Sequence, residues 1–187
     1  MASHHDQHRD NAHERLNVPI NRPIVLVGMM GVGKSSVGRK LAEQLRLAFV
    51  DADDEIELAA GMSIAEIFER FGETYFRDGE RRVIARLIDG APKVIATGGG
   101  AFINQQTRAL ILERTRSIWL DADIMVLAER VSRRNHRPLL SGRDPVKVLT
   151  ELGAVRNPIY AQAEIHIRSD ASPHTRTVEN ILKALTQ

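Results

Sequence analysis

Short apolar runs alternate with longer segments of helical periodicity along most of the chain. The run Ile24-Val25-Leu26-Val27 is continuous and apolar, as in a strand that is buried on both faces of a parallel sheet. The same pattern predicts strands at 24–27, 48–50, 93–96, 117–120 and 164–167, and helices at 34–46, 53–60, 63–71, 74–89, 104–114, 122–134, 145–156 and 174–186. Strands that alternate with helices predict an α/β fold whose parallel sheet is covered by helices on both faces.

Polar residues at two positions predict where helices begin. Ser63 is followed three residues later by Glu66, which is the capping-box pattern of a helix start. Ser172 and Pro173 are suited to the N-cap and the first position of the last helix. No internal repeat interrupts this single series of elements, so one domain is expected.

Residues 28–35 read GMMGVGKS and fit the pattern G-x-x-x-x-G-K-[ST] of a phosphate-binding loop. Glycines let the backbone approach phosphate oxygens, and the N–H groups at the start of the next helix form a nest for an anion. Lys34 is expected to neutralise the β- and γ-phosphates, and the Ser35 hydroxyl to bind Mg²⁺. The alternative is an ordinary glycine-rich turn, but the apolar strand before it and the amphipathic helix after it favour a nucleotide site.

Composition narrows the class of protein. The 187 residues suffice for one domain with a substantial core, and 43% hydrophobic with 27% charged residues is ordinary for a globular protein. The absence of cysteine excludes a disulfide scaffold and thiolate chemistry, and it is compatible with a cytoplasmic location. No apolar run approaches the roughly 20 residues needed to cross a bilayer. The net charge of +2 gives no general case for binding nucleic acid.

Two segments stand out by their charged residues. Residues 1–21 hold four of the seven histidines and few apolar residues, so we expect a flexible His-containing tail before a single domain at 22–187. The segment 130–147 has one acid, Asp144, and a series of basic residues, namely Arg130, Arg133, Arg134, Arg137, Arg143 and Lys147. These residues form either a solvated basic face or an anion-binding lid, and the phosphate loop favours the lid.

Polar and glycine residues follow the predicted strands, at the edge where ligands bind in parallel α/β sheets. Asp51 and Asp53 follow the second strand and are candidates for holding Mg²⁺, and Asp53 is also a candidate for accepting a hydrogen bond from an attacking hydroxyl. Capping of the next helix by Asp53 or Asp54 is the structural alternative. Gly98, Gly99 and Gly100 follow the third strand, where either a close approach to a ligand or a plain loop explains them.

Two arginines are candidates for binding a carboxylate. Arg77 and Glu80 are three residues apart on a predicted helix and share a face. They form either an exposed ion pair of little energetic value or a pair in which Glu80 orients the guanidinium fork of Arg77 toward a ligand. Arg156, in the sequence RNPIY, is open to the same two interpretations.

Six motifs occur together and in order. They are GMMGVGKS at 28–35, FVDAD at 49–53 with Glu57, FR at 76–77 with Glu80, TGGG at 97–100, RPLL at 137–140 and R-x-P-x-Y at 156–160. Together they resemble the shikimate kinase family, from about residue 22 to the C-terminus. The phosphate loop is shared with many families, whereas the combination of the other five motifs is much more specific. The resemblance implies a three-layer P-loop kinase fold of the nucleoside monophosphate kinase type, with a five-stranded parallel sheet in the order 2-3-1-4-5 and an Arg-rich lid.

The resemblance implies ATP-dependent phosphorylation of the 3-hydroxyl of shikimate, a step of chorismate and aromatic amino-acid synthesis, by a cytoplasmic monomer. Asp53 would contact the shikimate hydroxyls, Arg77 and Arg156 would clamp its carboxylate, and Lys34, Asp53 and Arg137 would be the catalytic residues. The implied ATP-binding residues are Gly31, Val32, Gly33, Lys34, Ser35, Ser36, Arg130, Arg137 and Pro173. The implied substrate-binding residues are Asp53, Arg77, Gly98, Gly99, Gly100 and Arg156, and the implied Mg²⁺ ligands, direct or through water, are Ser35, Asp51 and Asp53.

Two other functions stay open at this point. A gluconate kinase of the same fold would also need a carboxylate clamp, whereas a nucleotide kinase would need an apolar or aromatic base pocket, for which a chain with 4% aromatic residues offers little. A silent ATP-binding module is expected to have lost Lys34, Asp53 or an acceptor arginine, and all of them are present.

Overall fold

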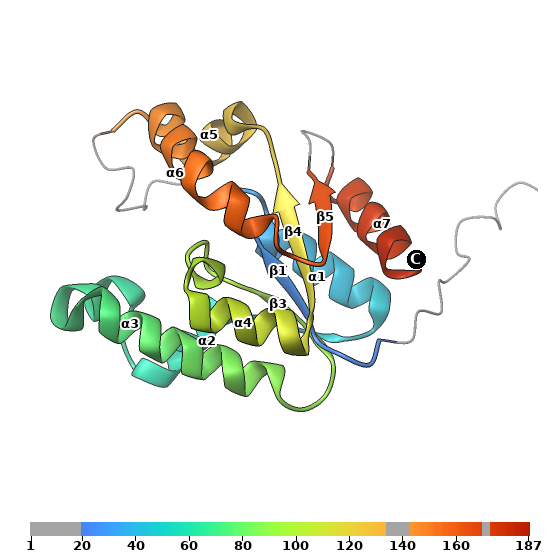
Figure 1. The fold of residues 1–187 in the computed structure, drawn as a ribbon, viewed down its shortest axis with the longest axis horizontal. Helices are drawn as coiled ribbons and strands as arrows, with labels where there is room; N and C mark the ends of the chain where they lie inside the picture. Colours follow the sequence, from blue (N-terminus) through green and yellow to red (C-terminus); the bar gives the residue numbers. More distant parts are fainter. Residues whose placement is uncertain (1–19, 134–142, 170–172) are drawn as a thin grey trace, which may run out of the picture.

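The computed structural model describes residues 20–133, 143–169 and 173–187. Five strands form one sheet in which every neighbouring pair is parallel, in the order β2-β3-β1-β4-β5 (Figure 1). The strands are β1 (Ile24–Val27), β2 (Ala48–Asp51), β3 (Lys93–Ala96), β4 (Arg116–Asp121) and β5 (Ile165–Arg168). The expected parallel sheet and its strand order are therefore confirmed.

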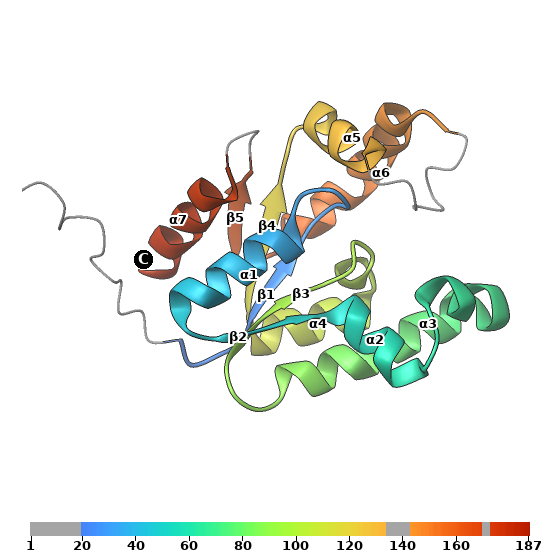
Figure 2. The same ribbon diagram turned by 180° about the vertical axis from the view of Figure 1, so that it is seen from behind.

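Helices cover both faces of the sheet. They are α1 (Lys34–Leu45), α2 (Ala52–Ala60), α3 (Ile64–Ile88), α4 (Gln105–Arg114), α5 (Ile124–Ser132), α6 (Pro145–Tyr160) and α7 (His174–Leu185), with a 3₁₀ turn η1 at Ala101–Ile103. Helices α1 and α7 pack against each other on one face, as Figure 2 shows, and α4 lies on the opposite face. The three-layer arrangement is confirmed, whereas Arg137 and the RPLL motif of the expected lid lie outside the described residues.

The core lies along the central strands. All four residues of β1 are fully buried, and so are Ile118 and Leu120 of β4, because helices cover these strands on both sides. The edge strands β2 and β5 are partly exposed, which fits their mixed composition. This difference is what a parallel sheet predicts, since only its central strands are enclosed by neighbours on every side.

Helix α3 spans the two helices expected at 63–71 and 74–89. Gly72 interrupts it with a φ of 78° and a ψ of 178°, so the two helical segments are confirmed and their boundary is a kink. The predicted capping box is also confirmed: Ser63 Oγ accepts from the Glu66 N–H at 3.2 Å, and Glu66 Oε2 accepts from the Ser63 N–H at 2.8 Å.

Most predicted helix bounds differ from the observed ones by no more than two residues, as at α5, which was expected at 122–134. Three helix ends differ in their capping residue or by several residues. The N-cap of α2 is Asp51, whose carboxylate accepts a hydrogen bond from the Asp53 N–H at 3.1 Å, so neither Asp53 nor Asp54 caps this helix. Pro173 occupies the N-cap position of α7 rather than its first turn, and Ser172 lies outside the described residues. Helix α6 continues through Pro158 to Tyr160, beyond the predicted end at residue 156, because the buried Tyr160 ring stacks against core aromatics.

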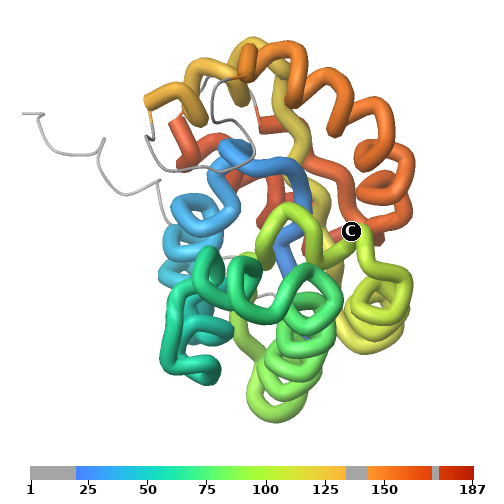
Figure 3. Tube along the Cα trace, turned by 90° about the vertical axis from the view of Figure 1, so that its left-hand side faces the viewer, coloured from blue at the N-terminus to red at the C-terminus, as the bar shows by residue number. Residues whose placement is uncertain are grey.

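The loop that follows β3, which contains Gly98–Gly100, lies in the middle of the molecule. Seen from the left of Figure 1, this loop lies between α2 and α3 on one side and α5 and α6 on the other (Figure 3). The phosphate loop that follows β1 lies beside it. Within the described ranges, no helix has the length and the apolar character that crossing a membrane requires.

Candidate active site

The phosphate loop has the backbone that its glycines permit. Gly28 and Gly33 have φ angles of 136° and 96°, in the region that side chains rarely adopt. A Cβ at Gly28 would lie 2.3 Å from the Leu120 carbonyl oxygen, so no other residue fits there. Lys34 opens α1, is only 9% exposed, and its Nζ donates to the carbonyls of Gly28 and Met29 at 2.7 and 2.9 Å. The lysine ammonium is therefore held at the loop, where a phosphate would meet it.

Ser35 and Asp51 bring oxygen atoms together beside this loop. Ser35 Oγ donates to Asp51 Oδ2 at 2.6 Å, while Asp51 Oδ1 caps α2. A hydroxyl and a carboxylate are hard oxygen ligands of the kind that Mg²⁺ prefers, and this ion keeps several of its waters. The described residues contain no group of three or more His, Asp and Glu side chains that would form a dedicated metal cage. The donor set thus fits a hydrated Mg²⁺ shared with phosphate oxygens.

Asp53 is the second residue of α2, and its surroundings disfavour a charged carboxylate. Burial raises the pKa of its carboxyl, the negative charge of Asp51 raises this pKa further, and the nearby Lys34 ammonium opposes both effects. Asp53 also lies against the glycine loop, since a Cβ at Gly98 would be 2.8 Å from Asp53 Oδ1. Asp54, by contrast, is exposed, as expected of a residue that faces solvent.

The triple-glycine segment makes close approaches at Gly98 and Gly100 and ordinary van der Waals contacts at Gly99. Gly98 faces Asp53, and a Cβ at Gly99 would lie 3.5 Å from the Met30 nitrogen and 3.7 Å from Arg156 Nη1. A Cβ at Gly100 would lie 2.3 Å from Arg77 Nη2. The sequence left a plain loop and a close approach to a ligand equally open. The structure shows that Gly98 and Gly100 lie close to side chains of the protein itself, and the approach to a ligand stays a prediction. These glycines leave room for side chains of the phosphate-loop side and of the arginine side to meet around one backbone segment.

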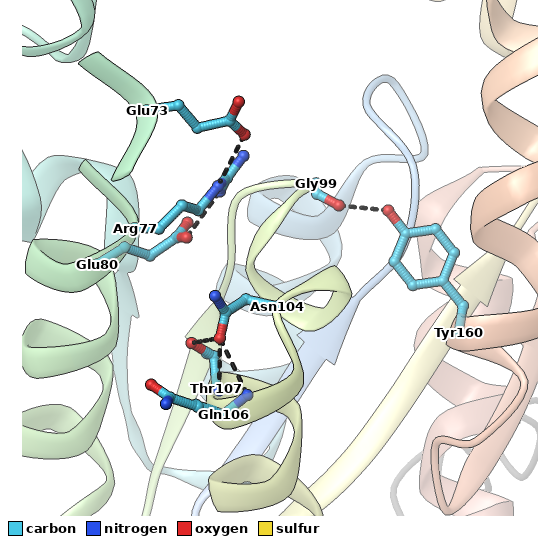
Figure 4. Close-up of polar contacts among 8 residues, drawn as sticks. All are labelled: Glu73, Arg77, Glu80, Gly99, Asn104, Gln106, Thr107 and Tyr160. Atoms are coloured by element: carbon cyan, nitrogen blue, oxygen red, sulfur yellow. Dashed lines mark hydrogen bonds and ion pairs between the residues drawn. The ribbon is translucent and has the colours of Figure 1, made fainter. Parts of the chain in front are cut away.

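Arg77 and Glu80 form a partly buried ion pair, not an exposed one. Arg77 Nη1 donates to Glu80 Oε2 at 2.7 Å, and Glu73 lies 3.4 Å from Arg77 Nε (Figure 4). Glu80 is only 1% exposed; burial raises its pKa, and the Arg77 charge opposes the rise. A buried carboxylate paired with arginine fixes the orientation of the guanidinium. The interpretation in which Glu80 orients Arg77 is therefore the one that the geometry supports.

Two pockets adjoin at the glycine segment. The first, of about 320 Å³, contains the phosphate loop with Lys34 and both aspartates; its lining is Met30, Gly31, Gly33, Lys34, Ser35, Ser36, Asp51, Asp53, Thr97, Gly98, Gly99, Arg130, Arg133 and His174. The second, of about 500 Å³, has both acceptor arginines; its lining is Glu73, Thr74, Arg77, Asp78, Arg81, Gly100, Ile103, Asn104, Gln106 and Arg156. The two predicted acceptor arginines and Gly100 line the second pocket, whereas Asp53, Gly98 and Gly99 line the first pocket together with the predicted donor residues.

Of the two residues expected near the adenine, Arg130 lines the first pocket and Pro173 does not. Arg130 Nη1 donates to the Val32 carbonyl at 3.3 Å, which holds the arginine against the phosphate loop. His174, next to Pro173, lines the same pocket and was not singled out from the sequence. Burial lowers the pKa of His174, and the positive charges of Arg130 and Lys40 lower it further, so its imidazole is neutral at pH 7. No motif spacing pointed to this histidine.

Replacing Gly100 by alanine should weaken acceptor binding specifically. The φ of Gly100 is −93°, so the backbone tolerates alanine, but the new methyl would displace the Arg77 guanidinium. We expect the KM for the acceptor to rise roughly ten- to a hundredfold, because small misplacements of a positioning group are costly. Steady-state kinetics would measure it. Gly79→Ala is the control, since nothing lies within 4 Å of that Cβ; equal KM values for both variants would contradict the close approach.

Known proteins with the same arrangement were found by sequence and by structure. A family model described as "SKI: Shikimate kinase" matches residues 30–186. A shikimate kinase of Caulobacter vibrioides is 62% identical over 166 residues, covering 89% of this chain and 83% of the relative. One of Novosphingobium aromaticivorans is 57% identical over 178 residues, covering 93% and 92%. Among solved structures, a shikimate kinase of Acinetobacter baumannii in complex with shikimate superposes with a TM-score of 0.84 at 36% identity, covering 88% of this chain and 93% of that one.

Proposed function

Because the chain belongs to the shikimate kinase family, we propose that its two adjoining pockets bind ATP and shikimate. The protein transfers the γ-phosphoryl group of ATP to the 3-hydroxyl of shikimate, which forms shikimate 3-phosphate and ADP, in the synthesis of chorismate and the aromatic amino acids. The observation that carries the two-pocket assignment is the glycine segment at which the pockets adjoin. Gly98 and Gly99 line the first pocket together with Asp53 and the phosphate loop, and Gly100 lines the second together with Arg77 and Arg156.

On the donor side, the phosphate loop and Lys34 bind the β- and γ-phosphates. Ser35 and Asp51 would hold Mg²⁺, partly through its water, and the ion would neutralise charge on the phosphates. Arg130 and the turn at Pro173 would lie against the adenine, with Gly31, Val32, Gly33 and Ser36 completing the ATP site. We include Arg137 as a residue that reaches the phosphates from the segment 130–147, although it lies outside the described residues.

On the acceptor side, Arg77 and Arg156 would bind the shikimate carboxylate while the glycine segment lies against its ring. Asp53, between this segment and Lys34, accepts a hydrogen bond from the attacking 3-hydroxyl. In a loose phosphoryl-transfer transition state, orientation of the hydroxyl matters more than early removal of its proton. The arrangement would therefore act mainly by positioning the two substrates and by neutralising the phosphate charge, which is what phosphoryl transfer needs.

The surroundings of the enzyme are proposals that rest on the family resemblance and on composition. We propose a cytoplasmic monomer that acts on a small molecule and binds neither nucleic acid nor membrane. We also propose that residues 1–21 are a tail that the single domain at 22–187 does not need for catalysis. Size-exclusion chromatography with light scattering would test the oligomeric state.

The position of the transferred phosphate tests the proposed function directly. The purified enzyme, ATP, Mg²⁺ and shikimate should give one phosphorylated product whose phosphorus couples to the proton on C3 in a two-dimensional ³¹P–¹H NMR spectrum. A product phosphorylated at another hydroxyl would contradict the assigned orientation. Release of ADP and inorganic phosphate without any phosphorylated acid would contradict transfer altogether.

Replacing Arg77 by lysine should separate the two substrates. Lysine keeps a positive charge beside the buried Glu80, but it lacks the planar fork that binds a carboxylate bidentately. We expect the KM for shikimate to rise about tenfold or more, with the KM for ATP almost unchanged. Arg82→Lys is the matched control, because Arg82 forms an exposed ion pair with Asp78 on the same helix. Equal changes in both KM values would contradict the carboxylate clamp.

A further inference from the structure

Tyr160, the last residue of α6, connects two parts of the acceptor site. Its side chain is fully buried, and its hydroxyl donates a hydrogen bond to the Gly99 carbonyl, 61 residues away in sequence (Figure 4). The ring stacks on Phe102 at 6.4 Å and on Trp119 at 6.1 Å between centroids. The phenol is therefore held firmly by its ring, and it points its one polar atom at the glycine segment.

The partner of this hydroxyl lies at the junction of the two pockets. A Cβ at Gly99 would lie 3.5 Å from the Met30 nitrogen and 3.7 Å from both the Gly28 oxygen and Arg156 Nη1, so Gly99 lies beside the phosphate loop and Arg156. Arg156 precedes Tyr160 by four residues on α6, so the two side chains share a helix face. The positive charge of Arg156 also acts on the Tyr160 hydroxyl. The Tyr160 hydroxyl thus binds the glycine segment at the place where Arg156 approaches it.

The protonation state of Tyr160 suits a permanent donor. Burial raises the pKa of its hydroxyl to about 12, although the positive charges of Arg156 and Arg77 act in the opposite direction. The proton therefore stays on the phenol at and around neutral pH. The Gly99 carbonyl always has a donor, and the hydrogen bond does not depend on pH near neutrality.

We infer that Tyr160 is a positioning residue of the acceptor site, because its hydroxyl holds the Gly99 peptide beside the Arg156 guanidinium. Tyr160 does not touch shikimate. It acts through the two groups that do, the glycine segment against the ring and Arg156 at the carboxylate. The inference rests on the proposed function, since these are the shikimate contacts assigned above.

A purely structural role is the competing explanation. A buried tyrosine needs a partner for its hydroxyl, and any backbone carbonyl would satisfy it. The identity of the partner favours positioning, because Gly99 lies beside both the phosphate loop and Arg156. A structural hydrogen bond and a positioning hydrogen bond differ in one measurable respect. Loss of the first lowers thermal stability alone, whereas loss of the second also changes shikimate binding.

Tyr160→Phe tests the inference, because phenylalanine keeps the stacked ring and removes only the hydroxyl. We expect the KM for shikimate to rise about tenfold and the KM for ATP to change less than about twofold. The emission of Trp119, the chain's only tryptophan, should stay unchanged, which shows that the ring is still packed and the variant folded. Tyr75→Phe is the control: it alters the other tyrosine, which is exposed and stacks on Phe71.

The double variant Arg156→Lys Tyr160→Phe supplies an independent readout. If Tyr160 acts through Arg156, the combined rise in KM should be clearly smaller than the product of the two single rises. Tyr160→Phe with a lower Tm but an unchanged KM for shikimate would overturn the inference, as would equal rises for shikimate and ATP. The wild-type enzyme is assayed alongside. If the wild type does not phosphorylate shikimate, the proposed function fails; if it does and Tyr160→Phe leaves the KM for shikimate unchanged, only the inference about Tyr160 fails.

Discussion

Lys34→Ala is expected to lower kcat by about a hundred- to a thousandfold, the range seen when one preorganised charge or donor is removed from an active site. The ammonium of Lys34 is held at the phosphate loop by the carbonyls of Gly28 and Met29, so it is in place before the nucleotide arrives. Its charge opposes the charge that develops on the transferred phosphoryl group. Alanine supplies neither the charge nor a donor, and no described side chain of the loop replaces it.

Rapid-quench measurement of phosphoryl transfer would test this prediction apart from product release. Lys40→Ala is the control. Lys40 is exposed and lies six residues after Lys34 on α1, so its replacement should leave the rate within about twofold. Circular dichroism would verify that both variants are folded. A Lys34→Ala enzyme with near-normal kcat would contradict the role of the loop in transfer.

Asp53→Asn is expected to lower kcat by about a hundredfold or more and to make the protein more stable at neutral pH. Burial and Asp51 raise the pKa of Asp53, so the folded protein binds this proton more tightly than the unfolded chain does. The stability from Asp53 is therefore fully present at pH values below its unfolded pKa, and it is lost as pH rises through the raised pKa. At pH 7 the carboxylate is a destabilising charge, which asparagine removes.

Thermal unfolding between pH 4 and 8, in buffers of about equal ionic strength, would measure the second effect. The Tm advantage of Asp53→Asn over wild type should grow with pH across the lower part of this range and then become constant. Asp54→Asn, an exposed neighbour, is the control and should show no such dependence. The rate of wild-type enzyme should fall on the acid side, where Asp53 becomes protonated. A less stable Asp53→Asn would show that hydrogen bonds of the carboxylate outweigh its burial.

The elements of the fold were largely predictable because their signals are local. The apolar run at 24–27 and the capping box at Ser63 are contained within a few residues, and both were confirmed. The end of α6 was missed because Pro158 is a helix-breaking signal in sequence. The packing of Tyr160 on Phe102 and Trp119, two residues far away in the chain, overrides it.

The site was predictable in its residue types and not in its contacts. Whether Gly100 is loop or contact depends on Arg77, which belongs to another element, and their approach exists only in the folded chain. Likewise, the pairing of Arg77 with Glu80 could be predicted from their spacing, whereas the burial of Glu80 could not. Tyr160 belongs to one of the sequence motifs, but the sequence predicts no role for it. The role of a buried tyrosine hydroxyl can be inferred only when its hydrogen-bond partner is known.

The central claim is that the residues facing the phosphate loop select a small hydroxylated carboxylate, shikimate. The most direct measurement is the initial rate of ADP release with shikimate, gluconate, AMP and CMP as acceptors, at equal ATP and Mg²⁺, with an acceptor-free reaction as the blank. We predict that shikimate alone raises the rate clearly above the blank. Turnover of gluconate or of a nucleotide, with no rate above the blank for shikimate, would contradict the account.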